Sequence, residues 1–241
     1  MVISVIIPAY NEERYLGQTL KSIQQAKEFL LKKDFVQTEI IVVDNGSIDS
    51  TSVLARSCGA TVVEEPKHNI ARVRNVGASF AKGNVLVFID ADTIVPEKLL
   101  WRINKVMASA ACFGGAVDTE YQPAKSLVKI HLQLWRILGK LAGMAQGATQ
   151  FSRRDVFASL LGYDESLYMG EDVNFHWRLK QFAKRQNAHV CFIEDIRVVP
   201  STRRFDQSSF CRTLIYTNPF YVFAFRRKER AWRDWYRVIP R

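Results

Sequence analysis

Short apolar runs, rich in β-branched residues, alternate with helical patterns along the first part of this chain, and this alternation constrains the fold more than any other feature. The runs occupy residues 2–7, 39–43, 61–64 and 85–89. Each run is continuously apolar, which is typical of strands buried on both faces of a parallel sheet. Strands and helices in this order predict a doubly wound α/β layer.

Three helices are expected between these strands, over residues 12–33, 47–58 and 69–82. The second begins at a cluster of N-cap residues. The third is expected to end at Gly83, because glycine is favoured just beyond the last turn of a helix.

The second half of the chain has a mixed order of elements. Helices are expected over residues 96–110, 127–141, 153–160 and 171–184, and strands over residues 112–119, 148–151 and 189–199. This order indicates a small antiparallel annex on the same sheet. No linker or repeat interrupts residues 1–202, so we expect one domain followed by a tail at residues 203–241.

The composition is that of a globular chain with an uneven charge. Among 241 residues, 48% are hydrophobic and 12% aromatic, which excludes disorder as the main state. The net charge of +10 suggests an anionic partner, either nucleic acid, a phosphorylated small molecule or an anionic membrane. Residues 203–241 hold ten basic and three acidic residues, a net charge of +7, so the body of the chain is nearly neutral.

Cysteine usage and the hydropathy pattern predict a cytoplasmic protein. The four cysteines are far apart and form no C-x-x-C motif: Cys58, Cys112, Cys191 and Cys211. We expect buried free thiols in a reducing cytosol. The start, MVISVIIPAYNEE, lacks the basic segment and cleavage site of a signal peptide, and no run of about 18 uncharged apolar residues is present.

Acidic residues follow three of the predicted strands, at the edge where open α/β sheets bind ligands. They lie in the segments 11–12, 44–45 and 90–92. A single aspartate after a strand is commonly a turn former or an N-cap. Three acidic segments at one sheet edge instead indicate a site, and the Asp-x-Asp pair of Asp90 and Asp92 can hold Mg²⁺ or Mn²⁺ together with substrate phosphates.

Known phosphate-binding loops do not account for this edge. The first strand runs into PAYNEE and not into G-x-G-x-x-G, and the chain contains no Walker A motif. The phosphates of a nucleotide would therefore need another partner, which again favours a metal ion.

Six segments together resemble family 2 glycosyltransferases of the GT-A fold. They are SVIIPAYNEE from Ser4, IIVVDNGSIDST from Ile40, ARVRNVGA from Ala71, VLVFIDAD from Val85, FSRRDVF from Phe151 and LGYDESLYMGEDVNFHWRL from Leu161. The resemblance covers about residues 2–202. It implies a single GT-A domain, with a nucleotide-binding half at residues 1–100 and an acceptor-binding half at 101–202. The central sheet would be mostly parallel, flanked by helices, with a small antiparallel annex.

The resemblance also implies an activity and a role for each matching residue. One sugar would pass from a nucleotide-diphosphate sugar, UDP-linked by default, to an acceptor hydroxyl with inversion. Nucleotide contacts are expected from Pro8, Ala9, Tyr10, Glu12, Asp44, Asn45, Arg74, Asp90 and Ala91. Asp92 and Asp90 would hold Mn²⁺ or Mg²⁺ at the diphosphate. Asp172 matches the catalytic base, and Glu171 would orient the acceptor or support its neighbour.

Two departures from the family pattern limit these expectations. No histidine follows the last strand, where the chain reads VVPSTRR, so a third metal ligand stays open. No Q-x-x-R-W motif is present either, which favours transfer of a single sugar.

The tail at residues 203–241 interleaves aromatic residues with arginines. This pattern suits the surface of an anionic bilayer, and equally a helix that packs on the body. We expect peripheral attachment to a membrane beside a glycan or lipid-linked acceptor, and no nucleic-acid partner. The alternatives are a sugar nucleotidyltransferase, whose G-x-G-x-R loop is missing after the first strand, and a non-catalytic nucleic-acid or membrane-binding module.

Overall fold

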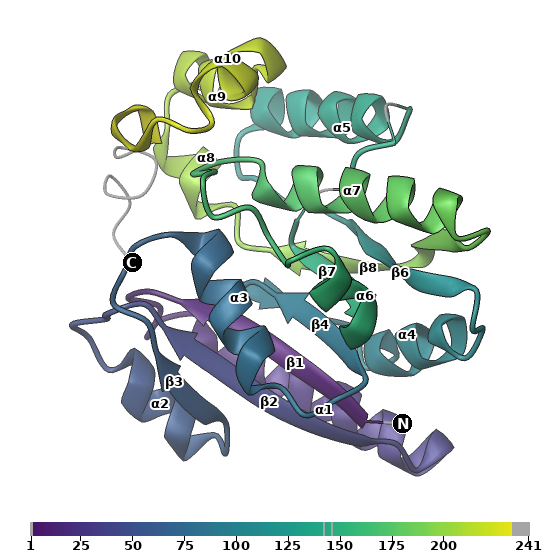
Figure 1. Cartoon of the computed structure of the whole chain (residues 1–241). Helices are drawn as coiled ribbons and strands as arrows, with labels where there is room; N and C mark the ends of the chain where they lie inside the picture. Colours follow the sequence, from purple (N-terminus) through teal and green to yellow (C-terminus); the bar gives the residue numbers. More distant parts are fainter. Residues whose placement is uncertain (1, 142, 146, 233–241) are drawn as a thin grey trace.

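The computed structural model describes residues 2–141, 143–145 and 147–232 of the chain (Figure 1). Its strands are β1 (Val2–Ala9), β2 (Gln37–Asp44), β3 (Thr61–Glu64), β4 (Val85–Ile89), β5 (Thr93–Ile94), β6 (Cys112–Thr119), β7 (Thr149–Arg153) and β8 (His189–Pro200). Its helices are α1 (Leu16–Asp34), α2 (Thr51–Ser57), α3 (Ile70–Phe80), α4 (Leu99–Met107), α5 (Ser126–Leu141), α6 (Arg154–Ser159), α7 (Glu171–Arg185), α8 (Arg203–Gln207), α9 (Phe210–Thr217) and α10 (Pro219–Phe225).

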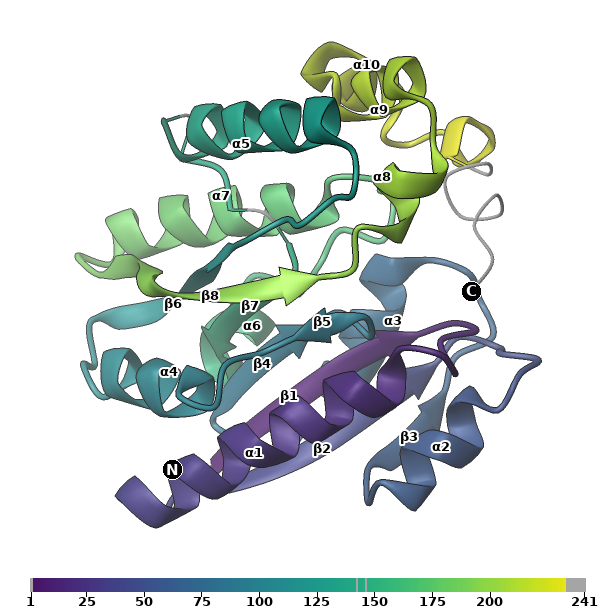
Figure 2. The same ribbon diagram turned by 180° about the vertical axis from the view of Figure 1, so that it is seen from behind.

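All eight strands form one sheet, in the order β3-β2-β1-β4-β7-β6-β8-β5. The first four strands of that order are parallel. The side chains of β1, β2 and β4 are mostly buried on both faces, whereas those of the edge strand β3 are half-buried or exposed, so the expectation of full burial is wrong for residues 61–64. Helices α1 and α4 cover one face, while α3, α6 and α7 cover the other (Figures 1 and 2). The predicted α/β layer is therefore confirmed, because apolar strands of this kind need a helix layer on each side.

The antiparallel annex is confirmed as part of the same sheet. Strand β7 is antiparallel to both β4 and β6, and β5 is antiparallel to the end of β8. Strands β6 and β8 are parallel to each other. The carboxyl ends of β1, β2 and β4 consequently open at one edge of the sheet, which is the edge that carries the acidic segments.

Three details of the predicted helices are wrong. Helix α2 begins at Thr51 and not at residue 47, and its N-cap residue Ser50 makes no side-chain capping hydrogen bond. Helix α1 begins at Leu16 and not at residue 12, because Asn11 has a positive φ of 52° and the chain turns before entering the helix. Helix α3 ends at Phe80, and Gly83 is not its C′ residue. Gly83 instead packs against β1, where a Cβ would lie 2.7 Å from the backbone nitrogen of Ser4, so close approach is what requires glycine.

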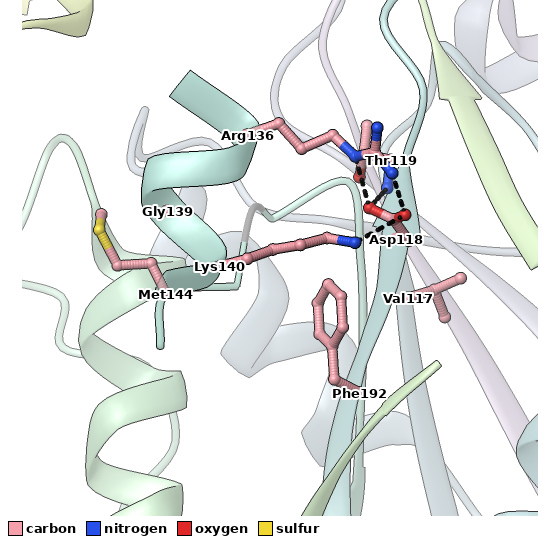
Figure 3. Close-up of a pocket in the computed structure, with 8 residues that line it drawn as sticks. All are labelled: Val117, Asp118, Thr119, Arg136, Gly139, Lys140, Met144 and Phe192. Atoms are coloured by element: carbon pink, nitrogen blue, oxygen red, sulfur yellow. Dashed lines mark hydrogen bonds and ion pairs between the residues drawn. The ribbon is translucent and has the colours of Figure 1, made fainter. Parts of the chain in front are cut away.

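Helix α5 is held on the sheet by a buried carboxylate. Asp118 of β6 accepts a hydrogen bond from Arg136 Nε at 2.8 Å and one from Lys140 Nζ at 3.1 Å. Figure 3 shows both side chains of α5 pointing toward Asp118. The two basic residues hold the pKa of Asp118 below its usual range, against the effect of burial. The face of α5 next to β6 is therefore anchored by charge as well as by its apolar residues.

The described part of the tail packs on the body. Helix α9 contacts α5 through His131, whose Nε2 lies 2.8 Å from Thr217 Oγ1. The backbone N–H of Tyr168 donates to the carbonyl of Arg226 at 2.7 Å, and Trp232 is fully buried. Part of the expected tail, residues 233–241 with Trp235 and Tyr236, lies outside the described residues.

The cysteines are free, as predicted, but they are not all buried. Cys112 is buried, Cys58 and Cys191 are half-buried, and Cys211 is exposed on α9 because the buried side of that helix is taken by Thr213. Burial and the neighbouring Cys191 thiol raise the pKa of Cys112 to about 12. Over residues 2–141, 143–145 and 147–232, no helix is both long and apolar enough to cross a membrane.

Candidate active site

A cavity of about 470 Å³ opens at the carboxyl edge of β1, β2 and β4. Every predicted site residue except Asp44 lines it: Pro8, Ala9, Tyr10, Glu12, Asn45, Arg74, Asp90, Ala91, Asp92, Glu171 and Asp172. The topology explains this gathering, since parallel strands bring their following loops to one edge. Residues from β1, β4 and α7, more than 80 positions apart, thus share one wall.

Asp44 is the exception among the predicted nucleotide contacts. Its Oδ1 accepts a hydrogen bond from the backbone N–H of Ser47 at 2.9 Å, and its Oδ2 accepts one from the hydroxyl of Ser52. Both oxygens therefore hold the loop after β2. The neighbouring Asn45 does line the cavity, with its side-chain amide donating to the carbonyls of Glu65 and Lys67.

Arg74 of α3 joins two carboxylates at the base of the cavity. Its Nη2 lies 2.8 Å from Asp90 Oδ1, and its Nη1 lies 2.6 Å from Glu171 Oε1. Only 3% of the Arg74 side chain is exposed, whereas 32% of Asp90 faces the cavity. Burial raises the pKa of Asp90 to about 6, although Arg74 opposes that shift. The sequence did not predict this bridge, in which Glu171 holds Arg74.

Asp172 lies in the first turn of α7, next to this bridge. Its Oδ1 accepts a hydrogen bond from the backbone N–H of Val173 at 2.7 Å. Burial, together with the charge of Glu171, raises the pKa of Asp172 to about 7. Gly147 lies against it, and a Cβ there would approach the carboxylate carbon to 2.7 Å. A carboxylate with a pKa near neutrality is suited to accept a proton from a hydroxyl.

A pH profile follows from the raised pKa of Asp172. If it is the base, kcat/KM for the acceptor should rise with pH through about 7, because only the ionised carboxylate accepts a proton. We expect about a tenfold rise in total from pH 6 to pH 8, because about a tenth of the carboxylate is ionised at pH 6, about half at pH 7 and about nine tenths at pH 8. The measurement is initial rate at saturating donor between pH 6 and pH 8, one unit on each side of about 7. A flat profile over this range would contradict the assignment.

Asp90 and Asp92 fit a divalent cation in part. The loop that carries them is fixed by hydrogen bonds from Thr19 Oγ1 to the carbonyl of Ala91 and from the N–H of Ser201 to that of Asp92. Asp90 pairs with Arg74 through Oδ1 and Asp92 pairs with Arg203 through Oδ2, so the other oxygen of each carboxylate lies outside these ion pairs. Hard cations commonly bind through one or two carboxylates plus substrate phosphates, so this donor set suits Mg²⁺ or Mn²⁺.

Among the described residues, no histidine, cysteine or acidic side chain completes a group of three with Asp90 and Asp92. Within the described part of the chain, the group of three ligand atoms close enough to hold an ion is Cys112, His189 and Cys191, at the opposite edge of the sheet. In place of a histidine, Arg203 lies after β8. Its Nη2 is 3.2 Å from Asp92 Oδ2, and it also forms a buried ion pair with Glu12.

Several residues in or behind the cavity wall were not predicted from the sequence; His68 lines the cavity, whereas Arg203 and Gln150 act through the residues that line it. Arg203 sits in the VVPSTRR segment, so the pair of arginines after the last strand was the available signal. His68 packs against Tyr10, with ring centroids 4.7 Å apart, at one end of the cavity. Gln150 donates from Nε2 to the carbonyl of Asp172 at 3.0 Å and accepts a hydrogen bond from the Tyr163 hydroxyl. No local pattern marks these contacts.

The fold is that of the GT-A class. A structure of Staphylococcus aureus TarS, residues 1–349, superposes with a TM-score of 0.63 at 16% identity, over 99% of this chain and 75% of that one. Glucosyl-3-phosphoglycerate synthase from Mycobacterium tuberculosis, in complex with Mn²⁺, UDP and glucosyl-3-phosphoglycerate, gives 0.61 at 20% identity, over 94% and 79%. At these identities the likeness establishes the fold.

Sequence comparison establishes the family. The model of Glycosyl transferase family 2 matches residues 4–161, and the chain belongs to this family. AglE from Haloferax volcanii is 26% identical over 188 residues, which are 73% of this chain and 59% of AglE. GlyG from Streptococcus pneumoniae is 32% identical over 108 residues, 41% of this chain and 33% of GlyG. The chain therefore spans between a third and three fifths of the length of these relatives.

Proposed function

We propose that this protein transfers one sugar from a nucleotide-diphosphate sugar to an acceptor hydroxyl with inversion, Asp172 acting as the base. The observation that carries the proposal is the ionisable Asp172 carboxylate beside the Asp90 and Asp92 pair in one cavity. The family and the nucleotide complexes of its structural neighbours support a nucleotide-sugar donor, with UDP as the default.

In this proposal the nucleotide lies across the ends of β1, β2 and β4. Pro8, Ala9 and Tyr10 line the base end with His68, while Asn45 and Ala91 lie along the wall. Glu12, Arg74 and Asp44 hold the loops from which that wall is built. Arg74 additionally keeps Asp90 ionised and directed into the cavity, because its positive charge favours the carboxylate form.

Asp92 and Asp90 would hold the divalent cation. When bound, Mn²⁺ or Mg²⁺ would supply positive charge for the leaving diphosphate. Mn²⁺ is present with UDP in the mycobacterial synthase and with GDP-mannose in the mannosyltransferase PcManGT from Pyrobaculum calidifontis, which supports a divalent cation here. Arg203 stands next to Asp92 and keeps that carboxylate in place by an ion pair.

The transfer itself needs one displacement. The acceptor oxygen forms its bond to the anomeric carbon while its proton passes to a carboxylate oxygen of Asp172, and the nucleotide diphosphate leaves with the electron pair of the broken bond. One base and one displacement give inversion without a second carboxylate nucleophile. Glu171 supports this arrangement through Arg74.

The surroundings of the reaction are also proposals. We expect the acceptor to be a cell-envelope or lipid-linked glycan and the protein to act in the cytoplasm, attached to an anionic membrane through residues 203–241. The acceptor would enter from the half formed by residues 101–202, opposite the nucleotide-binding half at 1–100.

Donor and metal dependence can be tested together. Thermal shift with UDP-, GDP- and dTDP-sugars, with and without Mn²⁺, should reveal one donor that stabilises the protein more when the ion is present. Asp92→Asn should lose that metal-dependent increment, because a neutral amide binds Mn²⁺ poorly. Failure of every donor to stabilise the wild type would count against the proposal. Release of a nucleoside diphosphate supports a transferase, whereas incorporation of a nucleoside triphosphate would indicate a nucleotidyltransferase.

A further inference from the structure

Helix α5 presents an apolar stripe that no described part of the chain covers. Five large side chains on it are more than half exposed: Leu127, Ile130, Leu134, Ile137 and Leu138. Their spacing of three, four, three and one residues places them along one side of the helix. The helix meets the body with other residues, including Val128 and Leu132, which are buried. The exposed stripe is thus a second apolar face, separate from the one that packs on the sheet.

Helices α9 and α10 extend this apolar surface. Four of their side chains are exposed: Leu214, Ile215, Phe220 and Phe223. His131 of α5, which contacts Thr217 and the ring of Phe210, joins the two parts. Figures 1 and 2 show the three helices together at the end of the molecule farthest from α2. We call the nine exposed side chains of α5, α9 and α10 the apolar surface. Exposed apolar side chains gathered on neighbouring helices commonly mark an interaction surface.

The two sequence segments that carry the apolar surface hold charges of one sign. Segments 124–145 and 207–228 contain no aspartate or glutamate. They contain eight basic residues: Lys125, Lys129, Arg136, Lys140, Arg212, Arg226, Arg227 and Lys228. Arg136 and Lys140 pair with Asp118 beneath the helix. The other six give these two segments an excess of positive charge.

We propose that this apolar surface docks on an anionic lipid bilayer, with α5 as its central element. An apolar helix face bordered by lysine and arginine is typical of helices that lie in the membrane interface, with acyl chains contacting the apolar side and headgroup phosphates the cations. A second copy of the chain fits less well, because two such faces would bring basic residues together with no acidic residue in these segments to oppose them. The membrane attachment proposed above was assigned to residues 203–241. Here α5 makes the main contact with the bilayer, and α9 and α10 of the tail add to it.

The position of this surface also bears on the acceptor. Phe205 of α8 and Glu229, which follows α10, line the active-site cavity. The segment that contributes α9 and α10 to the surface therefore also forms part of the cavity wall. A bilayer docked on α5, α9 and α10 would lie beside that wall. This arrangement favours an acceptor carried on a membrane lipid, an assignment that rests on the proposed function.

Flotation of the full chain with vesicles tests the docking. Wild type should float with an equimolar mixture of phosphatidylcholine and phosphatidylglycerol, and bind phosphatidylcholine alone more weakly, by up to about fivefold for each basic residue engaged. Ile130→Gln with Leu134→Gln should weaken binding at least about tenfold, because each change replaces an aliphatic side chain that would be buried in the bilayer on docking. The matched control is Ile48→Gln with Val53→Gln, which removes two exposed aliphatic side chains near α2 and should leave flotation unchanged.

The other outcomes would overturn the proposal. If both double variants float like wild type, the stripe does not contact lipid. If wild type does not float but forms a dimer in sedimentation that Ile130→Gln with Leu134→Gln dissociates, the apolar surface is a contact between copies. Donor binding by thermal shift without vesicles separates this result from the proposed function. The variant with Ile130→Gln and Leu134→Gln should be stabilised by the donor as much as wild type is. If no donor stabilises wild type, that result counts against glycosyl transfer and not against docking.

Discussion

Replacing Asp172 by asparagine is expected to reduce sugar transfer by about 100- to 10,000-fold, the range typical of a lost general base. Asparagine keeps the size of the side chain and an oxygen that can accept the hydrogen bond from the Val173 N–H. It cannot take up the proton of the acceptor hydroxyl. Donor stabilisation in a thermal-shift assay should therefore stay near that of wild type, while the rate of nucleotide diphosphate release with acceptor falls.

Asp155→Asn is the matched control for this variant. Asp155 also lies in the first turn of a helix, α6, and its Oδ1 accepts a hydrogen bond from the backbone N–H of the next residue, Val156, at 2.8 Å. It does not line the cavity. The control should leave both donor binding and transfer unchanged. If Asp172→Asn abolishes donor binding instead, Asp172 belongs to the donor site and another group must be the base.

The residues that the sequence could identify are those fixed by their position after a strand. Asp90 and Asp92 follow β4 directly, and Asp172 stands in a recognisable segment, so strand order and local pattern were enough to bring them to one edge. The same reasoning placed Asp44 in the site. In the structure its carboxylate holds the loop, because Ser47 and Ser52 lie within hydrogen-bond reach. A local sequence pattern predicts where in the fold a side chain lies, but it does not predict which groups donate hydrogen bonds to its oxygens.

The partners that fix the site come from distant parts of the chain. Arg203 pairs with Glu12, 191 positions away, and Arg74 pairs with Glu171, 97 positions away. Such pairs depend on how the helices pack on the sheet, which sequence periodicity does not specify.

The orientation of α5 could not be predicted for the same reason. Its helical pattern was clear from residues 127–141, yet only the structure separates the side that packs on the sheet from the side that is exposed.

Arg74→Met is expected to lower the free energy of unfolding by about 3–5 kcal/mol, as is usual when one partner of a buried ion pair is removed. Methionine fills a similar volume, so the loss comes mainly from charge. Asp90 and Glu171 would remain at the base of the cavity with no cation between them. Arg72→Met is the matched control, because Arg72 on the same helix also bridges two carboxylates, those of Glu65 and Glu165.

The Arg72 side chain is 39% exposed, so its removal should lower the free energy of unfolding much less than the removal of Arg74 does. The deficit of Arg74→Met should also depend on pH. Arg74 lowers the pKa of Asp90, so without it that pKa rises above about 6, while the unfolded value stays near 3.8. A raised pKa in the folded state adds stability when the group is protonated and loses it as pH rises. Urea unfolding should therefore show a smaller deficit at pH 5 than at pH 8. If both variants lose the same free energy of unfolding, or if the deficit of Arg74→Met grows toward low pH, then Arg74 does not stabilise the ionised carboxylates of Asp90 and Glu171.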